Sequence, residues 1–145
     1  MIGLIQLVNH ANVMQNNMQI GAINRGILAL IGIEKADNET SAEKLIDRIL
    51  DYRIFTDDAG KMNLNLKSID GGLLLVPQFT LVAETNKGTR PGFSKGMSPQ
   101  EGSVLFAYLA NYAKKIYSNV ETGKFGVNMQ VTLCNDGPVT FILTS

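Results

Sequence analysis

Two short, nearly continuous apolar runs, Ile27–Ile33 and Leu73–Leu81, constrain the possible folds most strongly. Each run is too short for most helices and is typical of a strand buried inside a protein. Buried strands need a hydrophobic core, and with 45% hydrophobic residues the 145-residue chain can form one. This composition excludes a disordered chain, which combines low hydrophobicity with high net charge. The length is that of one domain, and no repeat or linker divides residues 1–145.

Further strands are predicted near both ends of the chain. Ile2–Val8 is expected to form the first strand, and Val13–Gln15 is expected to pair with it. Val127–Cys134 alternates between apolar and polar residues, which indicates a strand buried on one face. Val139–Leu143 is expected to form the last strand, after a turn at Asn135–Pro138.

Two segments carry the start signals of helices, each followed by apolar residues on one face. Thr40 and Glu43 have the spacing of a capping box, in which two side chains bond to each other's backbone N–H groups. Ser98 is expected to cap the second helix, with Pro99 in its first position and Glu101 completing the box. The apolar stripes are Ala42, Leu45, Ile46, Ile49 and Leu50 in the first helix, and Leu105, Tyr108, Leu109, Tyr112 and Ile116 in the second.

Strand segments separated by two helices indicate an α+β fold with mainly antiparallel sheets. The second helix is expected to end near Tyr117 or Ser118. Met1–Leu7 has no basic start and alternates like a strand, so it is not expected to be a signal peptide. The chain has no apolar run of about 18 residues, so no membrane span is expected, and the predicted location is the cytoplasm.

The charges balance overall but are unevenly distributed. The chain has 13 Lys and Arg residues and 13 Asp and Glu residues, which argues against a protein that wraps a long nucleic acid. Residues 34–58 contain eight acids and four bases, a net charge of −4. Residues 61–95 contain five bases and two acids, a net charge of +3, and the bases are Lys61, Lys67, Lys87, Arg90 and Lys95. These segments are either ordinary solvated faces or a small basic patch for an anionic ligand.

Few side chains are available for acid–base or metal chemistry. His10 and Cys134 are the only histidine and cysteine, which excludes an internal disulfide and is too few for an ordinary zinc site. His10 is expected to be a structural or surface residue rather than a general base, and Cys134 a buried, inert thiol. No metal or cofactor is expected. An enzyme with this sequence would therefore use backbone dipoles, hydroxyl groups, positioning or a group of its substrate.

Three segments stand out, and each has an ordinary explanation. In Pro77–Leu81 two polar residues interrupt an apolar strand end, as in an edge strand that begins at a proline. Gly88–Gly96 has three glycines, two cations and one aromatic residue, which suit either a phosphate and a stacked base or a long mobile loop. Asn135–Thr140 has the composition of a hairpin turn.

Taken in order, these segments resemble one family, the D-aminoacyl-tRNA deacylases, also called D-tyrosyl-tRNA deacylases. The resemblance covers essentially the whole chain. Its motifs are Met1–Gln6, Tyr52–Phe55 followed by Gly60–Leu64, Gln78–Leu81, Arg90–Phe93, and Met129–Val131 leading into Asn135–Thr140.

The resemblance implies a barrel-like homodimer with two active sites at the subunit interface. The Gly137–Pro138 bond is cis in the family, and this segment enters the pocket of the partner subunit. Its rigid backbone carbonyls would accept hydrogen bonds from the α-amino group of the substrate. An L side chain would then collide with this backbone, whereas a D side chain would point outward, and glycyl-tRNA would also be accepted.

The implied reaction is hydrolysis of the ester between a D-amino acid and the terminal adenosine of tRNA, assisted by the 2′-hydroxyl of that adenosine. No cofactor is implied, and the acceptor end of tRNA is the partner. Gln78, Phe79 and Thr80 would form the catalytic pocket, with Thr80 positioning the substrate through its hydroxyl and backbone N–H. The substrate-binding residues would be Gly137, Pro138, Pro77, Met129, Asn135, Thr140, Arg90, Phe93 and Lys95.

Two positions depart from the family pattern. Pro77 stands where the motif usually has serine, so a hydroxyl and an N–H donor are missing. Leu7 stands where many members have an arginine that is expected to support the Gly137–Pro138 segment, and Arg25 is one candidate for replacing it. Two other functions stay open, a non-catalytic dimer that binds a small ligand or RNA, and a small hydrolase of free metabolites.

Overall fold

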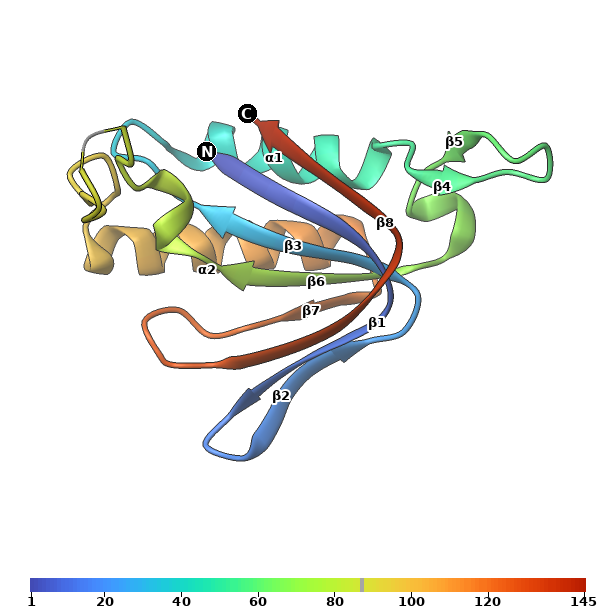
Figure 1. The fold of residues 1–145 in the computed structure, drawn as a ribbon, viewed down its shortest axis with the longest axis horizontal. Helices are drawn as coiled ribbons and strands as arrows, with labels where there is room; N and C mark the ends of the chain where they lie inside the picture. The colour runs from blue at the N-terminus through green and yellow to red at the C-terminus, as the bar shows by residue number, and fades with distance from the viewer. Residues whose placement is uncertain (87) are drawn as a thin grey trace.

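The computed structural model describes residues 1–86 and 88–145. These residues form eight strands, two α-helices and two short 3-10 turns (Figure 1). In chain order the elements are β1 (Ile2–Gln15), β2 (Met18–Ile23), β3 (Gly26–Gly32), α1 (Glu39–Asp51), β4 (Phe55–Thr56), β5 (Met62–Leu64), η1 (Lys67–Ile69), β6 (Gly72–Pro77), η2 (Phe79–Val82), α2 (Pro99–Ile116), β7 (Val120–Thr122) and β8 (Gln130–Thr144).

The main sheet is mixed, with antiparallel pairing in the majority. Its order is β2-β1-β3-β6-β7, and β8 pairs with the other edge of β1. β1 is antiparallel to β2, β3 and β8, whereas β3–β6 and β6–β7 are parallel. Parallel neighbours need a long crossover, and α1 and α2 lie in the two crossovers. The predicted α+β fold with mainly antiparallel sheets and two helices is confirmed.

The sheet curls until its two ends approach each other, as a barrel-like fold requires (Figure 1). β2 is at one end of the strand order and β7 at the other. Gly21 of β2 nevertheless lies so close to β7 that a Cβ atom there would be 3.0 Å from the carbonyl oxygen of Thr122. The curl gives the sheet an inner face and an outer face.

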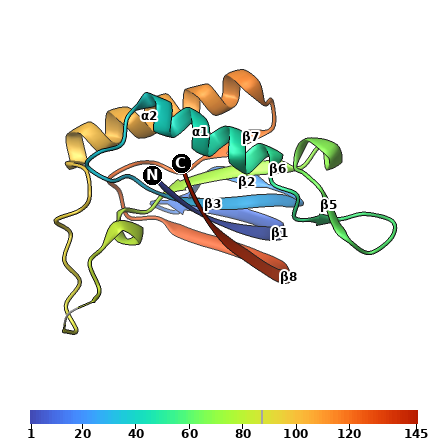
Figure 2. The same cartoon turned by 90° about the horizontal axis from the view of Figure 1, so that it is seen from above.

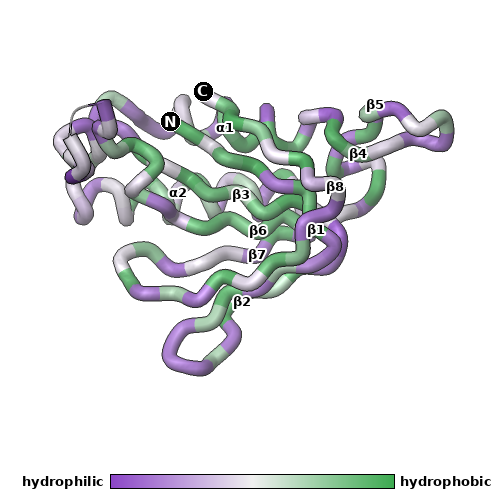
Figure 3. Tube along the Cα trace, in the orientation of Figure 1, coloured by the Kyte–Doolittle hydropathy of each residue, from purple (hydrophilic) through white to green (hydrophobic). Residues whose placement is uncertain are grey.

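Each face of the sheet has its own hydrophobic core. Both helices cover the outer face (Figure 2). The core between the helices and the sheet includes Ile5, Ile27, Ile31, Leu45, Ile49 and Leu109. The core inside the curl includes Val8, Val13, Leu28, Leu74 and Val76. β3 and β6 contribute to both cores, which explains why their sequences lack polar alternation (Figure 3). Among the described residues, no helix is long and apolar enough to cross a membrane.

The first strand is longer than predicted. β1 continues without a break to Gln15, so Val13–Gln15 does not fold back onto Ile2–Val8. It pairs instead with β2, a strand that the sequence analysis did not identify. Asn16 and Asn17 adopt positive φ angles of 49° and 62°, which asparagine tolerates and two-residue hairpin turns require. This Asn-Asn turn was the overlooked signal.

The apolar run Leu73–Leu81 is only partly a strand. β6 ends at Pro77, and residues from Phe79 to Val82 form the 3-10 turn η2. The strand stops at Pro77 because proline has no N–H to continue the hydrogen-bond ladder. Gln78 then leaves the extended conformation, with φ −142° and ψ 84°.

The last two predicted strands are one strand. β8 runs from Gln130 to Thr144, so residues 127–129, which were predicted as its first part, precede the strand. The expected turn is a bulge within β8. Gln6 of β1 pairs with Thr140, and Val8 of β1 pairs with Asn135. The chain therefore advances by five residues along β8 where it advances by two along β1, and the extra residues form the bulge. Pro138 lies inside this bulge, where its missing N–H breaks no ladder hydrogen bond.

The helix starts differ in how well they were predicted. α1 is capped by Asn38, not Thr40, because the Asn38 Oδ1 accepts from the Ser41 backbone N–H at 3.1 Å and Ser41 Oγ accepts from the Asn38 N–H at 3.4 Å. Ser98 caps α2 as expected, since its Oγ accepts from the Glu101 N–H at 3.3 Å. The expected box is not completed, because the Glu101 carboxylate accepts from the Ser98 hydroxyl at 2.5 Å instead of from the Ser98 backbone N–H. α2 ends at Ile116, one residue before the first of the two predicted end positions.

Two tyrosines of α2 bind carboxylates of α1 and hold the helices together. The Tyr108 hydroxyl donates to Glu43 Oε1 at 2.5 Å, and the Tyr112 hydroxyl donates to Asp47 Oδ1 at 3.0 Å. The hydrogen bond to Glu43, together with burial and the nearby negative charge, raises the pKa of Tyr108 to about 12. The hydrogen bond to Asp47 likewise raises the pKa of Tyr112.

Tyr108→Phe is expected to lower the free energy of unfolding at neutral pH, and to lower it less at high pH. The Tyr108 pKa rises from 10.0 to about 12 on folding, so its contribution is complete below pH 10 and is lost as the pH rises through about 12. Urea unfolding at neutral pH and just below pH 12 measures both differences. Tyr52→Phe is the control, because the Tyr52 hydroxyl bonds to no described residue. A difference between wild type and Tyr108→Phe that stayed constant with pH would contradict the expectation.

Candidate functional site

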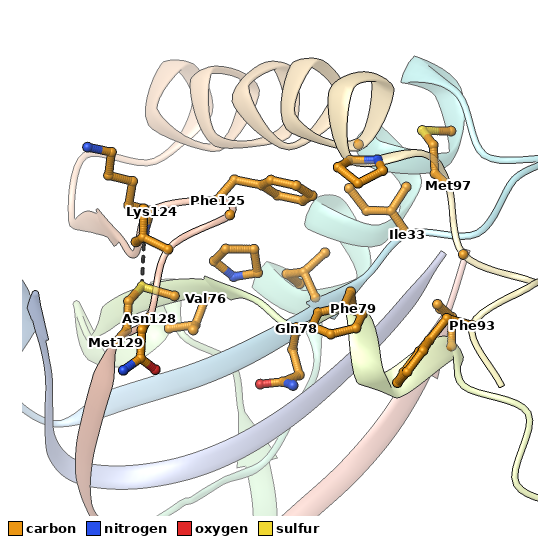
Figure 4. A pocket seen from close by; sticks show the side chains of 18 of the residues that line it. Ile33, Val76, Gln78, Phe79, Phe93, Met97, Lys124, Phe125, Asn128 and Met129 are labelled. Carbon is orange, nitrogen blue, oxygen red and sulfur yellow. Dashed lines mark hydrogen bonds between the residues drawn. The ribbon is translucent and has the colours of Figure 1, made fainter. Parts of the chain in front are cut away.

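A cavity of about 690 Å³ opens beside the C-terminal end of β6 (Figure 4). Its walls come from four parts of the chain: the ends of β3 and β6 with η2, the segment before α2, the first turn of α2, and the connection from β7 to β8. The lining is mostly apolar, with Phe79, Phe93 and Phe125 among its residues. An apolar hollow with a few polar groups is the usual form of a small-molecule site.

The break between β6 and η2 places the polar residues at the cavity. The Gln78 N–H donates to the carbonyl oxygen of Ile31 at 2.8 Å, which anchors the chain where it leaves the sheet. The Gln78 side-chain amide donates to the Thr80 hydroxyl, which joins the two polar residues of the motif. Phe79 stays 61% exposed, and its ring centre lies 5.0 Å from that of Phe93. The two rings form one side of the cavity (Figure 4).

The segment that carries Phe93 is held by a hairpin-like contact. Glu84 and Gly92 exchange two backbone hydrogen bonds, of 2.7 and 3.0 Å. Lys95 Nζ lies 2.5 Å from Glu84 Oε2. The hydrogen bond from Lys95 lowers the pKa of Glu84, and the same bond raises the pKa of Lys95. Lys95 is therefore engaged with Glu84, and neither it nor Arg90 lines the cavity.

The β7–β8 connection forms the wall that the sequence analysis missed. The Gly123 N–H donates to Leu75 at 2.8 Å, and the Lys124 N–H donates to Met129 Sδ at 3.2 Å. Phe125 packs under α2, where a Cβ on Gly102 would lie 3.0 Å from its ring. The segment combines glycines, a cation and an aromatic residue, the same signal that drew attention to Gly88–Gly96.

The structure brings together about half of the predicted site residues. Pro77, Gln78, Phe79, Phe93 and Met129 all line the cavity. Thr80 adjoins it through its hydrogen bond with Gln78. The lining does not include the other predicted residues, which are Arg90, Lys95, Asn135, Gly137, Pro138 and Thr140. Lys87, which the sequence analysis counted in the basic segment, lies outside the described residues.

Asn135, Gly137, Pro138 and Thr140 lie in and beside the bulge of β8. Gly137 and Pro138 are exposed, their peptide bond is cis, and Gly137 has a φ of +128°. Asn135 Oδ1 accepts from Gln6 Nε2 at 3.5 Å, which ties the bulge to β1. This segment is therefore presented at the surface, outside the lining of its own cavity.

The two residues linked to the missing family arginine lie on β1 and between β2 and β3. Leu7 is 5% exposed and packs in the core beneath the helices. The Arg25 guanidinium lies 5.8 Å from the centre of the Phe55 ring, a cation–π contact. Within the described residues, Arg25 makes no hydrogen bond to Gly137 or Pro138.

His10 and Cys134 are opposite each other on β1 and β8, and both are exposed. His10 was expected to be a structural or a surface residue, and it lies at the surface, whereas the prediction of a buried Cys134 is wrong. The alternation along β8 explains the error: Val131 and Leu133 pack against the inner core, so Cys134 points away from it.

The cavity offers positioning groups rather than an acid or a base. Of the described residues that line it, none is a histidine, cysteine, aspartate or glutamate, and Lys124 is the one ionisable residue. The side-chain amides of Gln78 and Asn128 are the other polar groups (Figure 4). No group of three or more metal-ligating side chains occurs in residues 1–86 and 88–145. Hydrogen bonding and shape are what this site can supply to a reaction.

Comparison with known proteins gives a consistent result over the whole chain. The family model described as D-Tyr-tRNA(Tyr) deacylase matches residues 4–144. A D-aminoacyl-tRNA deacylase of Pseudoalteromonas atlantica (strain T6c / ATCC BAA-1087) is 58% identical over 143 residues, covering 99% of both chains. One of Dichelobacter nodosus (strain VCS1703A) is 53% identical, also with 99% coverage of both.

Two solved structures have the same fold. A protein described as "c-Myc DNA Unwinding Element Binding Protein" superposes with a TM-score of 0.94 at 35% identity, covering 100% of this chain and 99% of the other. A structure described as that of "a probable eukaryotic D-amino acid tRNA deacylase" has a TM-score of 0.86 at 15% identity, covering 98% and 97%. At that identity the second similarity establishes the fold alone.

Gly102→Ala is expected to reshape the cavity with little change in stability. Alanine favours the α2 helix by about 1 kcal/mol over glycine, but its Cβ would press on the far edge of the Phe125 ring, which must shift. Urea unfolding is expected to show a net change below about 1 kcal/mol. Amide NMR signals of residues 123–129 are expected to move. Ser103→Ala, at the next and exposed helix position, should leave those signals in place. Unmoved signals in Gly102→Ala would refute the contact.

Proposed function

Because the chain belongs to the D-Tyr-tRNA(Tyr) deacylase family, we propose that it cleaves D-aminoacyl-tRNA with a cavity completed by its partner subunit. A D-aminoacyl-tRNA deacylase is a hydrolase of the aminoacyl-tRNA ester, so the chain is an enzyme and aminoacyl-tRNA is its substrate. The observation that carries the proposal is the cavity beside Gln78, Phe79 and Thr80, since the family motif coincides with a site of suitable size.

The proposed active unit is a homodimer. β8 pairs with β1 along one edge, and within the described residues its other edge has no partner strand. An open edge of 15 residues is prone to pair with another chain. Phe141 and Ile142 on this strand are 36% and 67% exposed, which gives the surface an apolar character suited to an interface. A second copy seated here would cover the bulge with Gly137 and Pro138.

In the proposed dimer, Gly137 and Pro138 of one subunit enter the cavity of the other. Two features support this: the segment is exposed, and it does not line its own cavity. Its backbone carbonyls would accept hydrogen bonds from the α-ammonium group of the substrate. With that group held, the L side chain would collide with the segment, and the D side chain would point away. Glycine has no side chain to exclude, so glycyl-tRNA is a proposed substrate as well.

In the proposed mechanism, water attacks the ester carbonyl with assistance from the adenosine 2′-hydroxyl. This suits a cavity whose described lining lacks a histidine or carboxylate that could act as a general base. Thr80 would position the ester through its hydroxyl, which the Gln78 amide already orients. The products are the D-amino acid and tRNA. Effective positioning of this kind lowers the barrier without a protein nucleophile.

The two departures from the family pattern affect the support of the site. Pro77 lines the cavity as an apolar wall and offers neither the hydroxyl nor the N–H of serine. We propose that Gln78 and Asn128 provide the remaining polar contacts. Leu7 lies on β1 between Gln6 and Val8, the residues paired with the two ends of the bulge, but it cannot hydrogen-bond through its side chain. Arg25 is one candidate for this support in the dimer, and the alternative is that no residue replaces the family arginine.

The proposed activity predicts stereospecific release of the amino acid. Incubation with D-tyrosyl-tRNA and L-tyrosyl-tRNA is expected to release tyrosine rapidly from the D form, and from the L form only at the rate without enzyme. Acid precipitation of labelled aminoacyl-tRNA measures both rates. Equal release from the two forms would refute the chiral selection. No release from either form would favour a non-catalytic RNA-binding dimer.

Complementation between two inactive variants tests the shared site. Phe79→Ala damages the cavity, and Pro138→Ala damages the segment expected to enter the partner's cavity. Each homodimer should be inactive toward D-tyrosyl-tRNA. A mixed dimer has one site with both parts intact, so unfolding and refolding an equal mixture should restore about one quarter of the wild-type activity. Refolded single variants are the controls. No recovery in a mixture that forms mixed dimers would refute the cross-subunit arrangement.

A further inference from the structure

The cavity has one fixed charge, on Lys124. This lysine is the only ionisable residue among the described residues of the lining. Its side chain is exposed and forms no ion pair with any described residue. Lys95, one of the two cations that the sequence analysis placed at the site, is instead paired with Glu84 at 2.5 Å. The charge of Lys124 is therefore the one available to a ligand at this cavity.

The position of Lys124 is well defined. Its backbone N–H donates to the sulfur of Met129 at 3.2 Å, and the preceding N–H of Gly123 donates to Leu75 at 2.8 Å. These bonds anchor the residue at the rim, next to the end of β6. Figure 4 shows its side chain at the opposite end of the cavity from Phe93, with the ammonium group directed outward. A group bound by this ammonium would lie at the entrance rather than inside.

The two charged groups of the substrate lie at opposite ends of its terminal nucleotide. At one end of an acylated adenosine is the α-ammonium group, and at the other is the phosphodiester that joins the adenosine to the rest of the tRNA. Lys124 attracts the phosphodiester and repels the ammonium group. With its phosphate at the rim, the terminal nucleotide would place its ester near Gln78 and Thr80. We propose that Lys124 is a positioning residue that binds the phosphodiester on the 5′ side of the terminal adenosine, an inference that rests on the proposed function.

Two substrates separate this role from a general effect on the cavity. D-Tyrosyl-tRNA has the phosphodiester, whereas adenosine esterified with D-tyrosine on its 3′-oxygen has none. Lys124→Ala is expected to lower kcat/KM for the tRNA substrate about tenfold, mainly through KM, and to change kcat/KM for the adenosine ester less than about twofold. Lys124→Arg should retain most of the activity toward both, because arginine also binds phosphate.

Salt dependence gives a second signature of a phosphate contact. For the tRNA substrate, the slope of log(kcat/KM) against log salt concentration should become shallower by about one unit in Lys124→Ala. Lys44→Ala is the matched control, since Lys44 is an exposed lysine of α1 outside the cavity. Its activity and salt slope should equal those of the wild type. An equal loss on both substrates, or no loss on the tRNA, would overturn the assignment.

A binding measurement makes the inference independent of catalysis. The trinucleotide CpCpA, the sequence shared by tRNA 3′ ends, contains the phosphodiester that adenosine lacks. Lys124→Ala is expected to weaken binding of CpCpA about tenfold and to leave binding of adenosine unchanged. Unchanged binding of CpCpA would overturn the role of Lys124. A wild-type protein that binds CpCpA but hydrolyses no ester would contradict the proposed function, while the binding result would still decide the inference.

Discussion

The pairing of β1 with three other strands underlies the whole structure. Along one edge β1 pairs first with β3 and then with β2, and along the other edge it pairs with β8 over almost its full length. A strand that changes partners midway lets the sheet curl, so the inner core forms separately from the core under the helices. The same pairing holds both ends of the β8 bulge, at Gln6 and Val8. The cavity and the exposed bulge are thus parts of one hydrogen-bonded framework.

Few ionisable side chains line the cavity, and this limits the chemistry that the site can perform. Its lining is mostly apolar, and its polar side chains can orient a substrate but cannot exchange protons with it readily. A site with such a lining can act on a substrate through preorganised contacts. The zero net charge of the chain agrees with this arrangement. A protein that holds only the end of a tRNA needs few phosphate contacts, whereas one that grips a long duplex needs many.

The sequence predicted the fold well where local chemistry decides the structure. Ser98 and Pro99 correctly gave the start of α2, because capping depends on neighbouring residues. At α1 two local candidates compete, and Asn38 caps the helix in place of the expected Thr40. The alternation predicted for Val127–Cys134 correctly gave the two faces of β8 from Gln130 onward. The predictions were less accurate where a hydrogen-bond partner comes from elsewhere. Whether the segment around Pro138 is a turn or a bulge depends on β1, which lies more than 120 residues earlier in the chain.

The candidate site likewise has features that the sequence predicted and features that only the tertiary structure revealed. The sequence alone showed the family motifs, including Gln78, Phe79 and Thr80, and the scarcity of acid–base residues. Both features depend only on which residues the chain contains and on their order. Only the tertiary structure showed that Lys95 is paired with Glu84 and that Lys124 and Phe125 line the cavity. The physical reason is that burial and ion pairing depend on which distant segments meet. The apolar pattern alone does not specify how the sheet curls to bring them together.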